Sequence, residues 1–261
     1  MNGLTHATLA IRRANQVYFE QVGARTTLNC CYAYVNETHP NLPTCNFVGE
    51  VALRGDGAAC WDEVQRFFAE RQATCSRWIP SAEQLPEELD ALLAPHGFVR
   101  RESVANILHR EAAPPDPRIR VLAARAMRRA YTQIASRRAL EHPRWSDALT
   151  SVQLERLNDA QYDAFVALRG DEPLAMAALL QVGEIGRLCD MYVIPEARRQ
   201  GIGAAMVSYL IATAKRWRLR PIVVDADATN TAGRRLLAQR GFTEDGTIVS
   251  LCRADVAEVF A

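Results

Sequence analysis

The sequence has few of the features that place a protein in a membrane or in an oxidising compartment. Its 261 residues contain no apolar run close to the roughly 20 residues that a membrane-spanning helix needs. Seven cysteines are scattered without a CxxC pair, so we expect neither a disulfide framework nor a zinc site, and we expect reduced thiols in the cytoplasm. The five histidines are dispersed as well, and no bound metal is expected.

Lysine is nearly absent, and excess charge of either sign is absent too. Lys215 is the only lysine, and 31 basic residues against 30 acidic ones leave a formal net charge of +1. Such a chain lacks the long-range attraction that draws proteins to nucleic acid or to anionic membranes, so neither is expected as a partner. Residues 1–15 show no apolar segment followed by a small-residue cleavage site, so no secretory signal is expected there. The sequence does not define an oligomeric state.

The sequence does contain enough apolar material for two domains, with 49% hydrophobic and 23% charged residues. The clearest boundary is the run Ala-Ala-Pro-Pro-Asp-Pro at residues 112–117, where three prolines in four positions block both helix and sheet. We therefore predict an N-terminal lobe at residues 1–112, a proline-rich linker at 113–117 and a second domain at 118–261.

In the second domain, apolar segments of strand length alternate with segments of helical periodicity. Strands are predicted at residues 119–123, 162–168, 174–182, 185–193, 221–226 and 247–252. Helices are predicted at residues 126–137, 147–157, 201–217 and 232–239. Gly241, after the last of these helices, is the expected left-handed terminator. This alternation predicts an α/β (α+β layered) domain with a mixed central sheet flanked by helices.

The first half repeats part of this order. Residues 92–98 match residues 236–242 in five of seven positions. A predicted strand at 46–53, a helix at 60–72 and a strand at 75–79 come before the first copy, as the same kinds of element come before the second. We therefore predict two tandem lobes that arose by duplication.

The most specific pattern is Arg-Arg-Gln-Gly-Ile-Gly at residues 198–203, between a predicted strand and a predicted helix. The first amides of a helix have no partner inside the helix and attract anions. Gly201 and Gly203 allow backbone to approach a phosphate, and Arg198 and Arg199 add charged donors. The pattern predicts a site for a phosphate-bearing ligand.

This pattern and a second one downstream resemble those of the GNAT superfamily of N-acetyltransferases. Members carry Arg/Gln-x-x-Gly-x-Gly/Ala, matched at residues 198–203, and Asn-x-x-Ala-x-x-Leu-Tyr-x-x-x-Gly-Phe, which corresponds to residues 230–242. In the second motif Gly233 replaces alanine and Leu237 replaces tyrosine. The resemblance covers about residues 118–252. The first half lacks the phosphate motif and carries Asp56 at the corresponding corner, so it is interpreted as a degenerate GNAT-like lobe that walls the substrate pocket or completes a pseudo-dimer.

The resemblance implies an N-acetyltransferase that uses acetyl-CoA as co-substrate, without a metal. A primary amine of a small acceptor would attack the thioester directly in a ternary complex. The amide of Val193 would polarise the thioester carbonyl. The residues that the resemblance assigns to acetyl-CoA are Met191, Tyr192, Val193, Arg198, Arg199, Gln200, Gly201, Ile202, Gly203, Ala204 and Asn230.

Two proton transfers in this reaction need side chains. Asp190 is the candidate base, because some relatives that acetylate diamines carry acidic residues at this point of the strand. The alternative for Asp190 is a carboxylate that caps or binds substrate, and Glu184, Asp225 and Asp227 are other candidates for the base.

The tyrosine that protonates the departing thiolate in many members is missing, because Leu237 stands in its place. Tyr192, Tyr209 or a water is expected to take this role, and Tyr192 is the catalytic candidate among them. Leu237 also motivates a rival hypothesis, a non-catalytic acyl-CoA-binding sensor or scaffold. A dinucleotide-dependent oxidoreductase is disfavoured, because Met206 stands where that fingerprint needs its third glycine.

Overall fold

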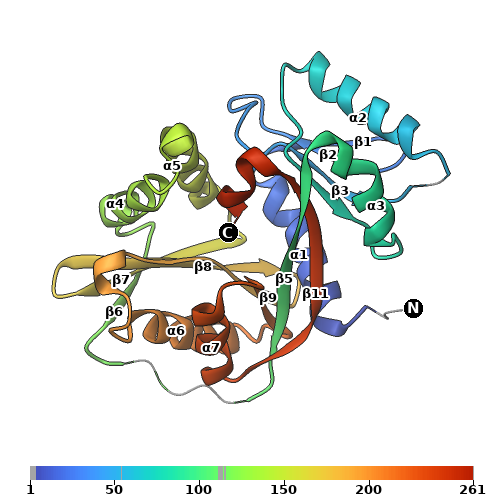
Figure 1. Cartoon of the computed structure of the whole chain (residues 1–261). Helices are drawn as coiled ribbons and strands as arrows, with labels where there is room; N and C mark the ends of the chain where they lie inside the picture. Colours follow the sequence, from blue (N-terminus) through green and yellow to red (C-terminus); the bar gives the residue numbers. More distant parts are fainter. Residues whose placement is uncertain (1–3, 54, 111–113, 115, 261) are drawn as a thin grey trace. The chain divides into compact units, whose positions relative to one another are not determined.

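The computed structural model describes residues 4–53, 55–110, 114 and 116–260 (Figure 1). Residues 113 and 115 of the predicted linker lie outside the described residues. The chain divides into two compact units. Unit 1 comprises residues 1–18 and 104–246, and unit 2 comprises residues 19–103 and 247–261.

This division differs from the predicted boundary at the proline-rich run. Helix α1 (His6–Glu20) belongs to unit 1 as far as residue 18, because its buried Ala14 lies in the core of that unit. Strand β11 (Phe242–Arg253) begins in unit 1 and ends in unit 2, where Leu251 pairs with Trp78. Strand β5 (Phe98–Leu108) begins in unit 2 and ends in unit 1. The chain therefore enters each unit more than once.

The sheet of unit 1 has the strand order β5-β10-β9-β8-β7-β6. Strands β6 to β9 are antiparallel neighbours, whereas β10 runs parallel to β9. Helices α4 and α5 lie on one side of this sheet and helices α6 and α7 on the other (Figure 1). The strands are β6 (Arg120–Ala123), β7 (Tyr162–Arg169), β8 (Glu172–Val182), β9 (Ile185–Val193) and β10 (Ile222–Asp227). The helices are α4 (Arg128–Ala139), α5 (Ser146–Glu155), α6 (Ile202–Arg216) and α7 (Thr231–Gln239).

These elements confirm the predicted mixed α/β fold with helices on both faces of the sheet. Strand β8 shows why a continuous apolar run predicted a strand. Its residues 174–180 are all buried, as expected for a strand covered on both faces. On α6 the predicted apolar stripe packs into the core, with Met206 and Leu210 at most 1% exposed. Strand β11 is longer than predicted, because it continues from Gly241 through both units.

Unit 2 contains an order of elements that matches part of unit 1. Strand β2 is antiparallel to β3, and β3 is parallel to β4, as β8, β9 and β10 are related in unit 1. Gly97 (φ 78°) and Gly241 (φ 91°) precede β5 and β11 in the left-handed conformation. The two units therefore share this order of elements, and the duplication itself stays a prediction. The elements of unit 2 are β1 (Ala24–Thr27), β2 (Tyr32–Val35), β3 (Phe47–Val51), α2 (Gly57–Glu70), β4 (Arg77–Pro80) and α3 (Pro86–Leu93).

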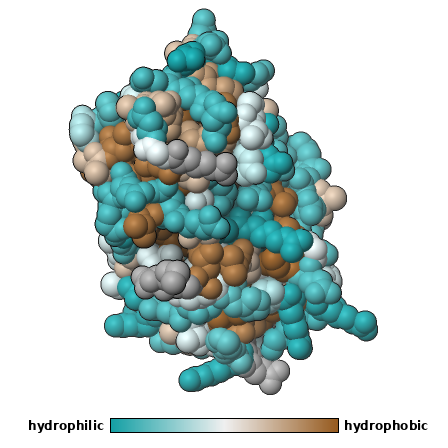
Figure 2. All heavy atoms as spheres, turned by 90° about the vertical axis from the view of Figure 1, so that its right-hand side faces the viewer, coloured by the Kyte–Doolittle hydropathy of each residue, from teal (hydrophilic) through white to brown (hydrophobic). Residues whose placement is uncertain are grey.

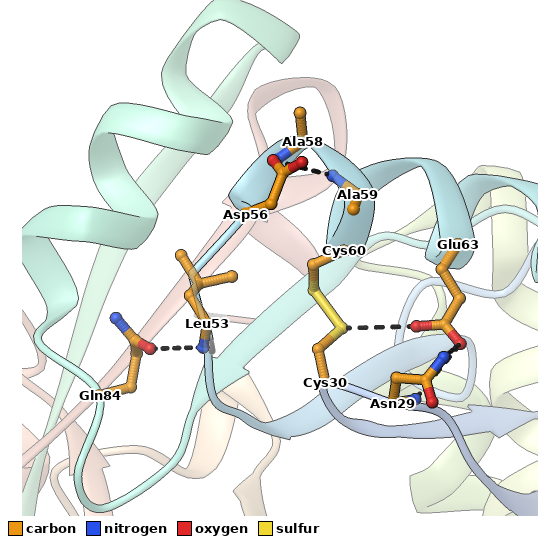
Figure 3. Close-up of a disulfide and its surroundings, with 9 residues drawn as sticks. All are labelled: Asn29, Cys30, Leu53, Asp56, Ala58, Ala59, Cys60, Glu63 and Gln84. Carbon is orange, nitrogen blue, oxygen red and sulfur yellow. Dashed lines mark hydrogen bonds between the residues drawn. A yellow bond between two sulfur atoms is a disulfide. The ribbon is translucent and has the colours of Figure 1, made fainter.

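The expectation of reduced thiols throughout is wrong for two cysteines. Cys30 and Cys60 form a disulfide, with Cα atoms 6.0 Å apart (Figure 3). The turn between β1 and β2 lies against the first turns of α2, where Glu63 also accepts hydrogen bonds from the amide and side chain of Asn29. A tertiary contact across 30 residues brings the two sulfurs together, and cysteine spacing alone does not reveal it. The free cysteines are Cys31, Cys45, Cys75, Cys189 and Cys252.

The described part of the chain lacks both a membrane-spanning helix and a metal-binding group of side chains. None of its helices combines the length and apolarity needed to cross a membrane. Within the same residues, no three His, Cys, Asp or Glu side chains are grouped so that they could hold a metal ion.

Candidate functional site

Strands β9 and β10 separate after a short parallel pairing. Their paired residues are Ile222 with Gly186 and Val223 with Arg187, although β9 continues to Val193 and β10 to Asp227. Backbone groups on the facing edges beyond Arg187 are therefore not used in a ladder between these two strands. An extended ligand can bind such an edge through main-chain hydrogen bonds, as an added strand does. We call this stretch the fork.

A β-bulge lies on the β9 side of the fork. Ala178 pairs with Cys189 and Met176 with Tyr192, so β9 contains one residue more than β8 over this stretch. Asp190 has a φ of 53°, in the left-handed region that aspartate tolerates better than most residues. Bulges re-aim side chains and are frequent beside active sites. Here the bulge sends the Asp190 carboxylate into a cluster of polar side chains.

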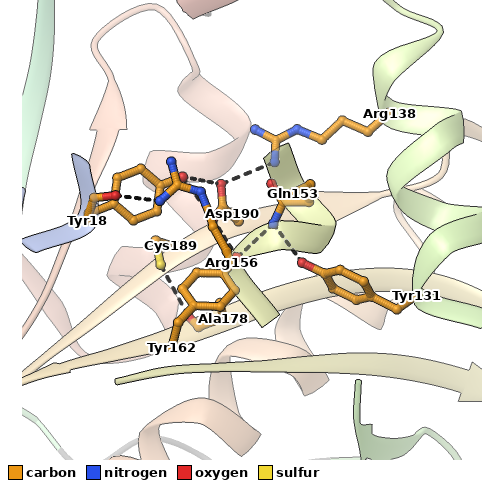
Figure 4. Close-up of polar contacts among 9 residues, drawn as sticks. All are labelled: Tyr18, Tyr131, Arg138, Gln153, Arg156, Tyr162, Ala178, Cys189 and Asp190. Atoms are coloured by element: carbon orange, nitrogen blue, oxygen red, sulfur yellow. Dashed lines mark hydrogen bonds and ion pairs between the residues drawn. The ribbon is translucent and has the colours of Figure 1, made fainter. Parts of the chain in front are cut away.

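Asp190 is the centre of that cluster (Figure 4). Its side chain is only 8% exposed. The hydroxyl of Tyr18 donates to Oδ1 at 2.8 Å, the hydroxyl of Tyr162 donates to Oδ2 at 2.6 Å, and Nη1 of Arg138 donates to Oδ1 at 3.3 Å. These partners come from α1, β7 and α4, so distant parts of the sequence converge on one carboxylate.

The surroundings of Asp190 keep it ionised. Burial raises the pKa of this carboxyl, but the positive charges of Arg138 and Arg156 and the two tyrosine hydroxyls lower it more, and the pKa falls to about 2. A carboxylate with so low a pKa and three donors is a weak base at neutral pH. The geometry therefore disfavours the general-base role expected from the sequence and favours the alternative, a carboxylate that caps or binds substrate.

A chain of hydrogen bonds continues from Asp190 into the helices. The side-chain amide of Gln153 donates to the hydroxyls of Tyr131 at 2.6 Å and Tyr162 at 2.7 Å (Figure 4). Burial raises the pKa of Tyr162 well above its ordinary value, so its hydroxyl stays a donor to Asp190. Sequence reasoning missed Tyr18, Tyr131 and Tyr162, because they lie in separate segments and no local motif joins them.

An ion pair connects the two strands where the fork opens. The Arg187 guanidinium donates to Oδ1 of Asp225 at 2.8 Å, and its side chain is 9% exposed. Burial lowers the pKa of Arg187, but the charge of Asp225 outweighs this, so the guanidinium stays charged. Asp225, an alternative base in the sequence analysis, thus has one oxygen committed to holding β10 against β9.

Tyr192 and Arg198 meet on one carboxylate near the end of β9. The Tyr192 hydroxyl donates to Oε1 of Glu141 at 2.9 Å, and Arg198 contacts the same oxygen at 3.2 Å. Burial, followed by the contact with Glu141, raises the pKa of Tyr192. Nε of Arg198 also donates to the Val193 carbonyl at 3.0 Å. Arg198 therefore braces the strand end, a role that the sequence pattern did not reveal.

The turn after β9 exposes backbone as the glycines predict. Gly201 has a φ of 81° and precedes α6, whose first intrahelical donor is the Ala205 amide, to the Gly201 carbonyl at 3.0 Å. The amides of Ile202, Gly203 and Ala204 lie in the first turn, where the helix offers no acceptor. A Cβ at Gly203 would lie 3.3 Å from Leu236 and 3.6 Å from Val193. The close packing and the bare amides fit a diphosphate.

The other residues of the turn are held by local contacts. Arg199 has a φ of 64°, an uncommon conformation for a side-chain-bearing residue. The Gln200 side chain donates to the Glu196 carbonyl at 2.7 Å and accepts from Arg169. Met191 is 36% exposed, in the bulge beside the fork.

The second motif has a structural role that the local geometry explains. The Asn230 side chain accepts a hydrogen bond from the Gly233 amide at 2.8 Å and caps α7. A Cβ at Gly233 would approach Asn230 to 2.9 Å, which accounts for the glycine in place of alanine. Leu237 is 2% exposed in the core, and the ring of Tyr209 packs edge-on against Phe165. Leu237 offers no proton donor, and the role of Tyr209 as an alternative to Tyr192 stays a prediction.

The corresponding helix start in unit 2 is closed by its own side chain. Oδ1 of Asp56 accepts hydrogen bonds from the amides of Ala58 at 2.9 Å and Ala59 at 3.3 Å (Figure 3). This carboxylate stands where the turn in unit 1 presents bare amides, and its negative charge would repel a phosphate.

Comparisons with known proteins gave a family match for part of the chain and likenesses to solved structures. Residues 124–242 match the family model described as acetyltransferase (GNAT) family. No curated protein matches the sequence.

Solved structures resemble the chain over nearly its whole length. They include a functionally unknown conserved protein from Staphylococcus epidermidis (TM-score 0.68, 15% identity, 92% of this chain and 96% of that chain). A second is a GCN5-related N-acetyltransferase from Kribbella flavida (TM-score 0.64, 15% identity, 94% of this chain and 94% of that chain). A third is a GCN5-related N-acetyltransferase from Sphaerobacter thermophilus (TM-score 0.60, 16% identity, 91% of this chain and 84% of that chain). At such identities the likeness concerns the fold alone.

Proposed function

Because residues 124–242 form a domain of the acetyltransferase (GNAT) family, we propose that the chain transfers an acetyl group from acetyl-CoA to a primary amine of a small acceptor. The observation that carries this proposal is the combination of the fork with the bare first turn of α6. Extended backbone for a pantetheine arm and free amides for a diphosphate lie at the same end of β9.

The residues of the turn would hold the diphosphate. The amides from Arg199 to Ala204 would be the donors, and a Cβ at Gly203 would lie 3.3 Å from the Leu236 side chain, closer than an ordinary contact. Met191, Tyr192 and Val193 would offer their backbone to the pantetheine arm. The Val193 amide would donate to the thioester oxygen, where negative charge develops during transfer.

In the reaction the amine nitrogen bonds to the acetyl carbon as the bond from carbon to sulfur breaks, and the proton lost by the nitrogen balances the one that the thiolate gains. Tyr192 is the candidate donor to the thiolate, with its hydroxyl held by Glu141. Asp190 would act as a positioning residue that fixes Tyr18, Tyr162 and Arg138 beside the bulge. Water then carries the proton from the amine.

Acetyl-CoA binding and thiol release test this function separately. Calorimetric titration with acetyl-CoA should give a dissociation constant in the micromolar range typical of enzyme substrates. Addition of a panel of primary amines should release free thiol over time, with the acetylated amine as the second product. Binding without thiol release from any amine would favour the non-catalytic sensor instead.

The low pKa of Asp190 predicts an acid-sensitive unit 1. This carboxyl has an ordinary pKa of 3.8 and a folded pKa of about 2, so its stabilising contribution is complete above pH 4 and is lost as the pH falls towards 2. We expect about 2 kcal/mol of the unfolding free energy to disappear over that window. Urea titrations of the wild type between pH 5 and pH 2 would measure this loss.

The Asp190→Asn variant, which has no carboxyl to titrate, should lose less unfolding free energy between pH 5 and pH 2 than the wild type does. Asp171→Asn is the matched control, because the Asp171 side chain is fully exposed in the same unit. Equal losses in Asp190→Asn and the wild type would remove Asp190 as the source of the acid sensitivity.

We further propose that unit 2 is a degenerate copy without an acetyl-CoA site. Asp56→Ala removes the cap of α2 and should reduce the unfolding free energy by about 1 kcal/mol, without changing acetyl-CoA affinity. The wild type should bind one acetyl-CoA per chain. A second binding event, in the wild type or in the variant, would contradict the proposal.

A further inference from the structure

The two sides of the sheet differ in character next to the fork. On one side, α6 packs against β8 and β9 with buried apolar residues that include Met206 and Leu210, and Leu237 of α7 joins the same core. On the side of α4 and α5, Arg138 contacts Asp190 in the bulge, and Gln153 contacts Tyr162. An acceptor amine on this side of the sheet would meet the side chains at the end of α4.

Arg138 is the cation that such an acceptor meets. It lies in the last turn of α4, and its side chain is 41% exposed although its guanidinium reaches the buried Asp190 (Figure 4). In the described part of the chain, the contact with Asp190 at 3.3 Å is the only hydrogen bond of this guanidinium. Its other N–H groups have no acceptor among the residues that the structure describes.

Asp190 does not depend on Arg138 for its hydrogen bonds. The Tyr18 hydroxyl lies 2.8 Å from Oδ1 and 2.9 Å from Oδ2, and the Tyr162 hydroxyl lies 2.6 Å from Oδ2. Both carboxylate oxygens thus have a donor without the guanidinium. Arg138 can offer most of its five N–H groups to another anion while it stays beside Asp190.

A negatively charged side chain lies three residues after Arg138 in the sequence. Glu141 is 45% exposed, and its contacts with Tyr192 and Arg198 both use Oε1. The end of α4 therefore presents a guanidinium and a carboxylate on the same side of the sheet. This pair complements a molecule that carries both an ammonium and a carboxylate.

We propose that the acceptor is an amino acid, or a similar small amine that carries a carboxylate, and that Arg138 binds this carboxylate. The proposal rests on the proposed acetyltransferase function. Arginine pairs with carboxylates through two parallel hydrogen bonds, which fixes orientation as well as adding affinity. The binding of the carboxylate by Arg138 would leave the amino group of the acceptor facing the bulge.

The test compares common amino acids with their amides in the thiol-release assay. The amide replaces the carboxylate by a neutral group of the same shape. For the accepted amino acids, kcat/KM should exceed that of the matched amide by about 10- to 100-fold, mainly through KM. Arg138→Gln should remove this difference, mainly by raising the KM of the amino acids, and Arg138→Lys should restore part of it.

Arg137→Gln is the matched control, since Arg137 is the neighbouring arginine, is also 41% exposed and pairs with Glu196 instead. It should keep the preference for the carboxylate. Melting temperature and acetyl-CoA affinity of each variant show that the fold and the fork are intact. Turnover of amides as fast as amino acids, or a preference that survives Arg138→Gln, would overturn the proposal while leaving acetyl transfer in place. No turnover of any amine would refute both.

Discussion

Replacing Gly203 by aspartate is expected to weaken acetyl-CoA binding by at least about 100-fold. The new carboxylate would lie in the first turn of α6, at the place where the diphosphate is proposed to bind. Two unit charges about 4 Å apart interact by about 4 kcal/mol near a protein surface, so repulsion alone accounts for such a loss. A Cβ at this position also lies 3.3 Å from Leu236 and adds steric strain. Calorimetric titration with acetyl-CoA measures the effect.

Gly203→Asn separates charge from bulk, because asparagine has nearly the same shape without the charge. We expect this variant to lose about 10-fold in affinity, less than the aspartate variant. The melting temperature of both ligand-free proteins should be similar. If Gly203→Asp binds acetyl-CoA as the wild type does, the diphosphate does not lie on this turn, and the proposed function loses its main support.

Reduction of the disulfide between Cys30 and Cys60 is expected to lower the unfolding free energy of unit 2 by about 3 to 4 kcal/mol. The cross-link closes a loop with a sequence separation of 30 residues and restricts the unfolded chain accordingly. Urea unfolding in a Trp145→Phe/Trp217→Phe background, followed by tryptophan fluorescence, reports this unit, because the remaining Trp61 and Trp78 pack together in it. The measurement is made with and without dithiothreitol.

The double variant Cys30→Ser/Cys60→Ser provides the control. Its stability should match that of the reduced wild type and should not respond to dithiothreitol, because the five remaining cysteines are free. A wild type that is equally stable with and without reductant would show that the cross-link does not stabilise unit 2. Acetyl-CoA affinity should not change in any of these samples, since the disulfide lies in the other unit.

The sequence predicted those parts of the fold that depend on local periodicity. Strand β9 was predicted at its observed bounds, and α6 within one residue at each end, because an uninterrupted apolar strand followed by glycines and an amphipathic stripe leaves little choice. The phosphate turn was also readable, since Gly201 must adopt a positive φ there. At these places the local sequence alone determines the local structure.

The polar cluster around Asp190 could not be predicted in the same way. The sequence indicated Asp190 by its position on the strand, but its ionisation is decided by Arg138 and Arg156, which lie more than thirty residues away in the sequence. Tyr18 is farther still, in the first helix of the chain. The disulfide and the division into units could not be predicted either, because each depends on which distant segments pack together.

The path of the chain through its two units limits how the protein can be shortened. Cutting at the proline-rich run would give a fragment that keeps residues 124–242 but lacks Tyr18, a donor to Asp190, and β5, the neighbour of β10. The family match therefore does not delimit the whole of unit 1. A deletion of the first 18 residues would leave the central carboxylate of unit 1 without one of its two hydroxyl donors, and a deletion that also removes β5 would expose an edge of the sheet at β10.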